Sequence, residues 1–311
     1  MTRPRIGLVL GSGAARGWCH IGVIDALHEA GIEPDIVCGT SMGALVGGAY
    51  VAGGLDGLRQ WAETATWREI IALVDVRLAG GGVVSGNLVT GFLHRFGMAK
   101  AIEACAKPFA AVATDLVTGR EIWFETGPLG EAVRASISLP GVFGPVRSGE
   151  KWLVDGGLCN PVPVSVCRAL GAEIIIAVNL NGDILGRRFQ SEPDQPAAAA
   201  PSPPMPAEFI ARMLGQLPAG LREQATQMAS GLFSHGPASP GYFEVLANSI
   251  NVMQDHITRT RLAGEPPHVM LLPRLGHIGV MEFNRAGEAI AEGRLCVEQA
   301  LPMIRRLVHG G

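Results

Sequence analysis

The stretch DIVCGTSMGALVGGAYVAGG, residues 35–54, is a long apolar run that is interrupted by a small polar residue, Ser41, between two glycines. Residues 36–55 carry no charge, and one interpretation of such a run is a membrane span. A second interpretation is a buried strand that ends in a tight turn at Ser41 and continues into a helix. The second is favoured, because repeated glycines serve a sharp turn and have no use in a span.

Alternating strands and helices are predicted around this stretch. Residues 5–11, RIGLVLG, form a continuous apolar run that ends in glycine, which is typical of a buried parallel strand. Residues 18–30 have apolar side chains at helical spacing and stop at Gly31. The next strand is predicted at 34–39 and a helix rich in small residues at 42–54. This order predicts an α/β fold with a parallel sheet and helices on its faces.

The remainder of the chain continues the same pattern. Further strands are predicted at 108–113, 121–124, 151–154, 173–179 and 268–273, the first two as a hairpin, and a closing helix at 284–307. An amphipathic helix is predicted to pack on the body through Phe243, Leu246, Ile250, Met253 and Ile257. A segment rich in Pro and Ala at about 181–207 is predicted to be a mobile surface insertion. We therefore expect a single domain over residues 1–311.

Composition limits the classes of function. With 311 residues, 48% of them hydrophobic, the chain can form one large core, and its net charge of −3 with scattered Lys and Arg argues against a nucleic-acid partner. Six separated cysteines without CxxC pairs predict reduced thiols and no metal site. The first residues contain no run suited to a signal peptide, so we expect a cytoplasmic protein. A mean hydropathy of +0.27 is compatible with peripheral contact to a membrane, and oligomeric state is not indicated.

The pentapeptide Gly39-Thr40-Ser41-Met42-Gly43 is a GxSxG sequence. It is weak alone, but a strand precedes it and a helix follows, as a nucleophile elbow requires. The flanking glycines allow the backbone to turn and leave the Ser41 hydroxyl at the carboxyl end of the strand. The helix that follows presents unpaired N–H groups to a developing anion. We therefore predict Ser41 as a nucleophile.

A second glycine-rich segment, LGSGAARGW at 10–18, follows the neighbouring strand. It does not fit a dinucleotide fingerprint, because its last glycine comes one residue late, nor a P-loop, which needs a following Lys and Ser or Thr. Its position predicts an oxyanion loop, whose backbone N–H groups point at Ser41. The predicted loop residues are Gly11, Ser12, Gly13, Ala14, Arg16 and Gly17. Arg16 either supports this loop and its positive potential or is an ordinary arginine at the surface or at a helix start.

A third segment, Asp155-Gly156-Gly157, follows an apolar strand. Such a sequence is often only a turn. Its functional interpretation is a carboxylate at the same sheet edge, where it can accept the Ser41 proton.

Histidine is the usual partner of a catalytic serine, so its absence from these motifs is informative. The α/β-hydrolase order of Ser, acid and His places several strands before the elbow, whereas only two precede Ser41 here. His256 and His277 come late enough but have no motif around them, and His20 lies in a helix where a structural role is favoured. A two-residue Ser–Asp arrangement is the economical alternative.

The segments GSGAARG, GTSMG and DGG, in this order, resemble those of the patatin-like phospholipases. The sequence around them is similar to the bacterial branch of this family that is related to neuropathy target esterase. Supporting blocks lie at 7–32, 110–124, 133–146, 152–178 and 261–273. The resemblance covers nearly the whole chain except the Pro/Ala segment.

This resemblance implies a three-layer α/β/α patatin-like fold with a mainly parallel central sheet, and hydrolysis of lipid esters without a metal or other cofactor. It assigns Ser41 as nucleophile, Asp155 as base and residues 12–17 as the oxyanion loop. Ser12 and Ala14 stand where the family commonly has glycine, and their β-carbons restrict the backbone. The implied partner is a lipid or another acyl ester.

Two other classes of function remain open. An acyltransferase would use the same elbow and pass the acyl group to an alcohol or thiol in place of water. A non-catalytic regulatory protein could retain the fold.

Overall fold

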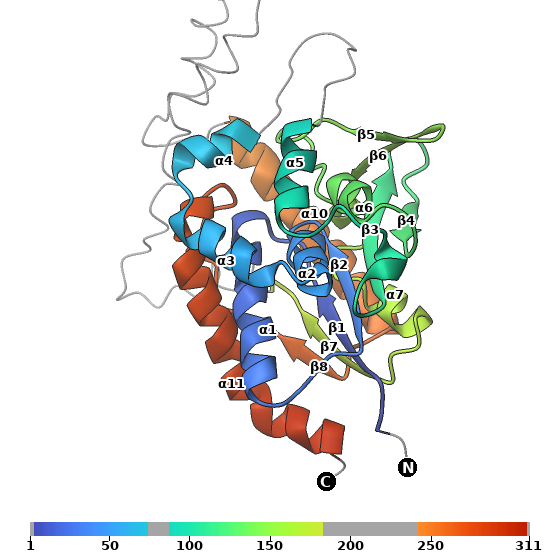
Figure 1. Cartoon of the computed structure of the whole chain (residues 1–311), viewed down its shortest axis with the longest axis vertical. Coiled ribbons are helices and arrows are strands. Elements are labelled where there is room, and N and C mark those ends of the chain that lie inside the picture. Colours follow the sequence, from blue (N-terminus) through green and yellow to red (C-terminus); the bar gives the residue numbers. More distant parts are fainter. Residues whose placement is uncertain (1–2, 74–86, 183–241, 310–311) are drawn as a thin grey trace, which may run out of the picture.

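Parallel strands form most of the central sheet, which has eight strands within the parts of the chain that the computed structural model describes, residues 3–73, 87–182 and 242–309 (Figure 1). The strands are β1 (Ile6–Leu10), β2 (Ile36–Thr40), β3 (Phe109–Asp115), β4 (Glu121–Phe124), β5 (Val146–Ser148), β6 (Lys151–Asp155), β7 (Ile174–Val178) and β8 (Val269–Leu271). Their order is β5-β6-β3-β2-β1-β7-β8, with β4 paired to β3. Neighbours from β3 to β8 are parallel, while β4, β5 and β6 are antiparallel to their partners. The predicted fold class is confirmed.

Helices lie on both sides of this sheet (Figure 1). The α-helices are α1 (Cys19–Glu29), α2 (Met42–Ala52), α3 (Leu55–Thr64), α4 (Trp67–Leu73), α5 (Asn87–Arg95), α6 (Leu129–Ser136), α7 (Val164–Ala169), α10 (Tyr242–Gly264) and α11 (Ala286–His309). Short 3-10 helices are η1 (Ala14–Trp18), η2 (Ile102–Ala104), η3 (Gly156–Leu158) and η5 (Phe283–Arg285).

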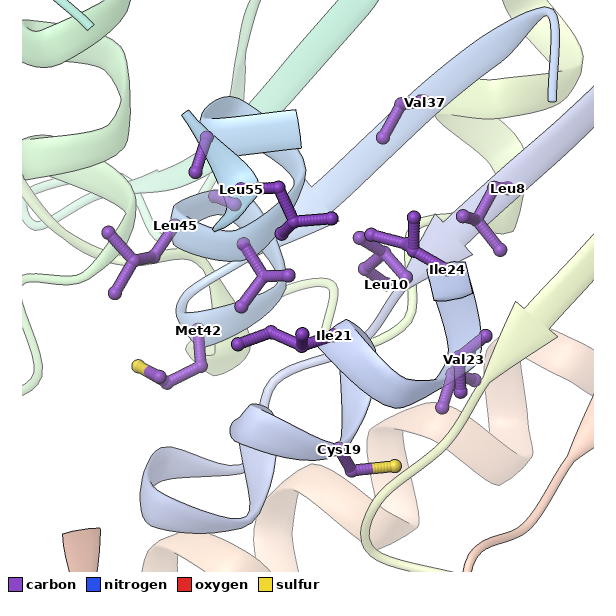
Figure 2. Close-up of a cluster of buried hydrophobic side chains, with 14 of the residues drawn as sticks. Leu8, Leu10, Cys19, Ile21, Val23, Ile24, Val37, Met42, Leu45 and Leu55 are labelled. Carbon is purple, nitrogen blue, oxygen red and sulfur yellow. The ribbon is translucent and has the colours of Figure 1, made fainter. Parts of the chain in front are cut away.

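Alternate side chains of β1 point into two separate cores. Leu8 and Leu10 pack with Ile21 and Ile24 of α1 and with side chains of α2 (Figure 2). The same cluster also contains side chains of α11. Val9 belongs to the opposite core, together with side chains of α7. A strand that is buried on both faces is apolar at every position, which explains why β1 and its parallel neighbours read as continuous apolar runs.

The register of β3 explains how distant segments meet. β2 pairs with the first half of β3, with Thr40 opposite Val112, and β6 pairs with the second half of the same edge, with Asp155 opposite Ala113. Because β6 runs antiparallel to β3, the carboxyl ends of β2 and β6 face each other along that edge. Residue 41 therefore follows β2 at the point where β6 ends.

The uncharged run at 36–55 forms β2, the turn at Ser41 and α2 in the protein core, which excludes the membrane interpretation of this run. Across the described ranges, no helix combines the length and the apolar character that crossing a bilayer requires.

The predicted packing face of α10 is correct at Ile250, which is buried, and at Ile257, which is half-buried, but wrong at Met253, and the side chains of Phe243 and Leu246 lie outside the described residues. Met253 is 52% exposed, whereas Asn251, Gln254 and Thr258 on the adjoining face are buried. Two of these buried polar side chains, Asn251 and Gln254, form hydrogen bonds to a loop at the sheet edge, as described below. Of the predicted Pro/Ala insertion, residues 183–207 lie outside the described residues, and Asn181 is buried.

Candidate active site

Ser41 occupies a strained turn between β2 and α2. Its φ of 56° makes it one of two non-glycine residues with positive φ in the described ranges. The close approach of α2 to the sheet depends on Gly43, because a β-carbon there would lie 1.9 Å from the carbonyl oxygen of Leu10. A strained, non-glycine residue between a strand and a helix is the geometry of a nucleophile elbow.

Asp155 lies at the end of β6 and is fully buried. The Ser41 hydroxyl donates to its Oδ2 over 2.5 Å, and the Gly157 N–H donates to its Oδ1 over 2.7 Å. Burial raises the pKa of Asp155 to about 6, while the hydrogen bonds from Ser41 and Gly157 act in the opposite direction. A carboxylate with this pKa is ionised at neutral pH and is a stronger base than an exposed aspartate.

Residues at the C-terminal end of α6 form hydrogen bonds to the backbone of both Ser41 and Asp155. The Ser41 N–H donates to Ser136 Oγ over 2.9 Å, and the Ser136 hydroxyl donates to the Val112 carbonyl over 2.6 Å. The Asp155 N–H donates to the Ser138 carbonyl over 3.0 Å. These contacts hold the backbone of the elbow and of the carboxylate on one scaffold. They also occupy the Ser41 N–H, so this group is not available to an oxyanion.

The glycine-rich segment links β1 to η1 and is held by backbone hydrogen bonds at its two ends. Ser12 N–H donates to the Pro161 carbonyl over 2.8 Å, and Ala15 N–H donates to the Val280 carbonyl over 3.1 Å. Between them, the N–H groups of Gly13 and Ala14 have no acceptor among the described residues. Two adjacent unpaired N–H groups are the donor arrangement of an oxyanion hole.

This loop packs against the elbow and, like the elbow, contains a strained residue. A β-carbon at Gly17 would lie 2.3 Å from Cβ of Met42, so the loop packs directly on the first residue of α2. Ala14 has a φ of 48° and is the second residue with strained positive φ. Alanine therefore adopts the left-handed conformation that glycine favours, and its β-carbon does not prevent the turn.

Arg16 and His20 are buried beneath the loop. The Arg16 guanidinium donates to Asn251 Oδ1 over 3.2 Å, and burial lowers the pKa of Arg16 to about 10. Arg16 is thus not an ordinary surface arginine. His20 Nε2 lies 2.8 Å from the Gly11 carbonyl and donates to it, since a carbonyl oxygen only accepts. Burial lowers the pKa of His20 to about 4, which keeps the ring neutral at neutral pH.

The other candidate histidines lie elsewhere. His256 is exposed on α10, and His277 pairs with Glu288 at 3.6 Å. Within the described ranges, no histidine forms a hydrogen bond with Ser41 or Asp155. No group of three or more potential metal ligands occurs in those ranges either.

Most sequence-predicted site residues therefore lie together. Gly39, Met42 and Gly43 surround Ser41, and Gly156 packs against Val112, where a β-carbon would lie 2.1 Å from the carbonyl oxygen. Two further polar residues contact the site: Ser136 Oγ accepts from the Ser41 N–H, and Gln254 Oε1 accepts from the Ser12 hydroxyl. No local sequence signal points to Gln254, because a polar side chain on an amphipathic helix is normally expected to face solvent.

Several known proteins are similar to this chain, two of them over nearly its whole length. A protein named as an uncharacterised NTE family protein of Mycobacterium tuberculosis is 34% identical over 341 residues, which cover 96% of this chain and 92% of the relative. Another NTE family protein of that species is 30% identical and covers 95% of this chain and 46% of its own. Patatin-like phospholipase domain-containing protein 6 of Mus musculus is 34% identical over 187 residues, 58% of this chain and 14% of that protein.

A solved structure and a family model complete the comparison. VipD from Legionella pneumophila has 13% sequence identity and a TM-score of 0.46, covering 97% of this chain and 67% of that one. The model of the patatin-like phospholipases, which generally hydrolyse lipid esters, matches residues 8–168, the part that contains the glycine-rich loop, the elbow and Asp155. The chain belongs to the patatin-like phospholipase family.

Proposed function

We propose that this protein is a serine lipid acyl hydrolase of the phospholipase or lysophospholipase type that uses Ser41 and Asp155 as a catalytic dyad. The observation that carries the proposal is the 2.5 Å hydrogen bond from the Ser41 hydroxyl to a buried carboxylate, formed at a strained elbow. Serine is a weak nucleophile near neutral pH and needs an adjacent base, and Asp155 is the group in contact with its hydroxyl.

The first half-reaction acylates Ser41. Its oxygen attacks the carbonyl carbon of the ester while Asp155 accepts the hydroxyl proton, which gives a tetrahedral oxyanion. The carbon–oxygen bond to the alcohol then breaks, and the leaving alkoxide takes the proton from Asp155. The products are acyl-Ser41 and a free alcohol, which is a lysolipid or a glycerophosphodiester.

The second half-reaction restores the enzyme. Asp155 removes a proton from water, the hydroxide attacks the acyl carbonyl, and the Ser41 oxygen leaves and recovers the proton. The product is a free fatty acid. In both halves the negative charge develops on the acyl oxygen, and the unpaired N–H groups of Gly13 and Ala14 support its stabilisation, with Met42 at the helix N-terminus as a further donor.

The departures from the common glycine pattern are compatible with this role. Ala14 takes the positive φ that a glycine would adopt, and Ser12 directs its side chain away from the loop backbone to α10. Neither side chain therefore forms a hydrogen bond to the unpaired N–H groups.

Labelling with a fluorophosphonate and a lipid-hydrolysis panel test the proposal together. We expect wild-type protein to release fatty acid from at least one phospholipid or lysophospholipid, and peptide mapping to place the label on Ser41. Ser41→Ala should abolish both results. A label on Ser136 or Ser138, or release of fatty acid by folded Ser41→Ala, would refute the assignment.

The same assay separates the alternative functions. An acyltransferase would form acylated acceptor in preference to fatty acid when an alcohol or thiol is added. A regulatory protein without catalysis would show neither product nor label.

A further inference from the structure

Helix α10 reaches the candidate active site with polar side chains. Asn251, Gln254, Asp255 and Thr258 form a buried stripe on this helix, which we call the polar stripe. Burying such groups is unfavourable unless they form hydrogen bonds. Two members of the stripe, Asn251 and Gln254, bond to the glycine-rich loop across more than 230 residues of sequence.

Gln254 joins three segments that follow the ends of different strands. Its Oε1 accepts from the Ser12 hydroxyl over 3.0 Å and from Asn181 Nδ2 over 3.1 Å. Its amide nitrogen lies against Gly157, because a β-carbon at Gly157 would be 2.4 Å from Gln254 Nε2 and 2.9 Å from Asp155 Oδ1. One side chain therefore contacts the loop after β1, the turn after β6 and the segment after β7.

The contacts of α10 lie on both sides of the unpaired N–H groups. Ser12 bonds to Gln254 and Arg16 bonds to Asn251, and between them stand Gly13 and Ala14. The strained φ of Ala14 persists only if its surroundings hold it, and a loop of small residues has little packing of its own. Donors of an oxyanion hole are effective when they are fixed before the reaction.

We propose that Gln254 is a positioning residue that fixes the glycine-rich loop through Ser12, so that the C-terminal part of the chain, beyond the residues 8–168 that match the family model, completes the active site. The kinetic part of this inference rests on the proposed hydrolase function. This role explains the serine at position 12, because its hydroxyl forms a hydrogen bond to α10 that a glycine could not form.

The test replaces each partner of this bond. Gln254→Met keeps the length of the side chain and removes its acceptor, and Ser12→Ala removes the donor from the other side. Thr258→Val is the matched control, because Thr258 is buried one turn further along the same face but donates only to the Gln254 carbonyl of its own helix. Each variant is measured on a soluble short-chain ester and by hydrogen exchange of the peptide covering residues 11–18.

We expect Gln254→Met and Ser12→Ala each to lower kcat by about 10- to 100-fold with KM changed less than about threefold, because the loop acts in the transition state. The double variant should be no slower than the worse single variant, since both substitutions remove the same Ser12–Gln254 hydrogen bond and Gln254→Met already removes the one from Asn181 as well. Exchange at 11–18 should accelerate in both single variants and stay unchanged in Thr258→Val.

Independent effects that multiply in the double variant, or unchanged exchange in the single variants, would overturn the proposal. Exchange does not depend on turnover, so it decides the positioning role even if wild-type protein hydrolyses no ester, in which case only the proposed function fails. If Gln254→Met does not fold, Ser12→Ala tests the same bond from the loop.

Discussion

In the proposed dyad, Asp155 acts as a base although its carboxyl group is buried. Burial raises its pKa to about 6, and hydrogen bonds from Ser41 and the Gly157 N–H keep it from rising further. General-base catalysis is most effective when the pKa of the base lies near the working pH, so this environment suits proton transfer better than that of an exposed aspartate. The hydrogen bonds and the burial thus jointly set the pH range in which the proposed dyad works.

The rate of ester hydrolysis should follow the ionisation of Asp155. We predict that kcat/KM on a soluble ester rises with pH through about 6 and then levels off, because only the ionised carboxylate accepts the Ser41 proton. Asp155→Asn retains the shape but loses the base, and should lower kcat roughly 10²–10⁴-fold. A fully active Asp155→Asn protein would contradict the dyad.

Substitution of histidines should distinguish the dyad from a triad. His256→Gln and His277→Gln should retain most activity, because these side chains lie away from Ser41 and Asp155. His20→Gln should also retain most activity, since a glutamine amide can donate to the Gly11 carbonyl that His20 Nε2 contacts. The measurement is kcat for each variant whose thermal melt shows that it is folded. One folded His variant as inactive as Ser41→Ala would overturn the dyad.

Local motifs predicted the candidate pair Ser41 and Asp155 but not the residues that contact them. Ser41 and Asp155 stand in short sequences whose strand and glycine neighbours indicate a turn at a sheet edge. Ser136 and Gln254 act on Ser41 and Ser12 across 95 and 242 residues of sequence. Such contacts arise from the register of β3 and the path of α10, which no local pattern contains.

At the scale of elements, α1 and α11 pack closely because each presents a glycine. A β-carbon at Gly22 would lie 1.9 Å from the Ile290 carbonyl oxygen, and one at Gly293 would lie 2.1 Å from the Cys19 carbonyl oxygen. His20 of α1 also contacts the carbonyl of Gly11 in the glycine-rich loop, so this helix pair supports the candidate site. The buried strands and long helices were predictable from their apolar spacing, whereas the short helices between α2 and β3 were not assigned.

Gly22→Ala should therefore destabilise the protein, by more than about 2 kcal/mol, because its methyl group would meet backbone that cannot move aside without separating the helices. Thermal or urea unfolding measures this loss. Gly91→Ala in α5 is the matched control, since a β-carbon there meets nothing within 4 Å. The control should be neutral or more stable by up to about 1 kcal/mol, because alanine is the better helix former. Equal effects of the two substitutions would contradict this account of the contact.

At the scale of the whole molecule, two buried titratable groups influence stability in opposite directions. Burial raises the pKa of Asp155 from 3.8 to about 6, so its contribution to stability is complete below pH 3.8 and is lost as pH rises through about 6. Burial lowers the pKa of His20 from 6.5 to about 4, so its contribution is complete above pH 6.5 and is lost as pH falls through about 4. Each shift corresponds to a free energy on the order of 3 kcal/mol.

Because the two pH windows overlap, the two contributions offset each other between about pH 4 and pH 6.5. A variant that lacks one of the two groups should therefore show the pH dependence of stability that the other group causes. Relative to wild type, Asp155→Asn should gain stability at pH 8 and lose that advantage as pH falls to 4. His20→Gln should show its greatest relative stability near pH 4 and its least at pH 8. Urea unfolding of the three proteins at pH 4, 5, 6, 7 and 8 measures these differences, and the titration of all other groups cancels because the proteins share them. Parallel stability curves for wild type and Asp155→Asn would show that the carboxyl group titrates normally in the fold. That result would also remove the reason for expecting its enhanced basicity.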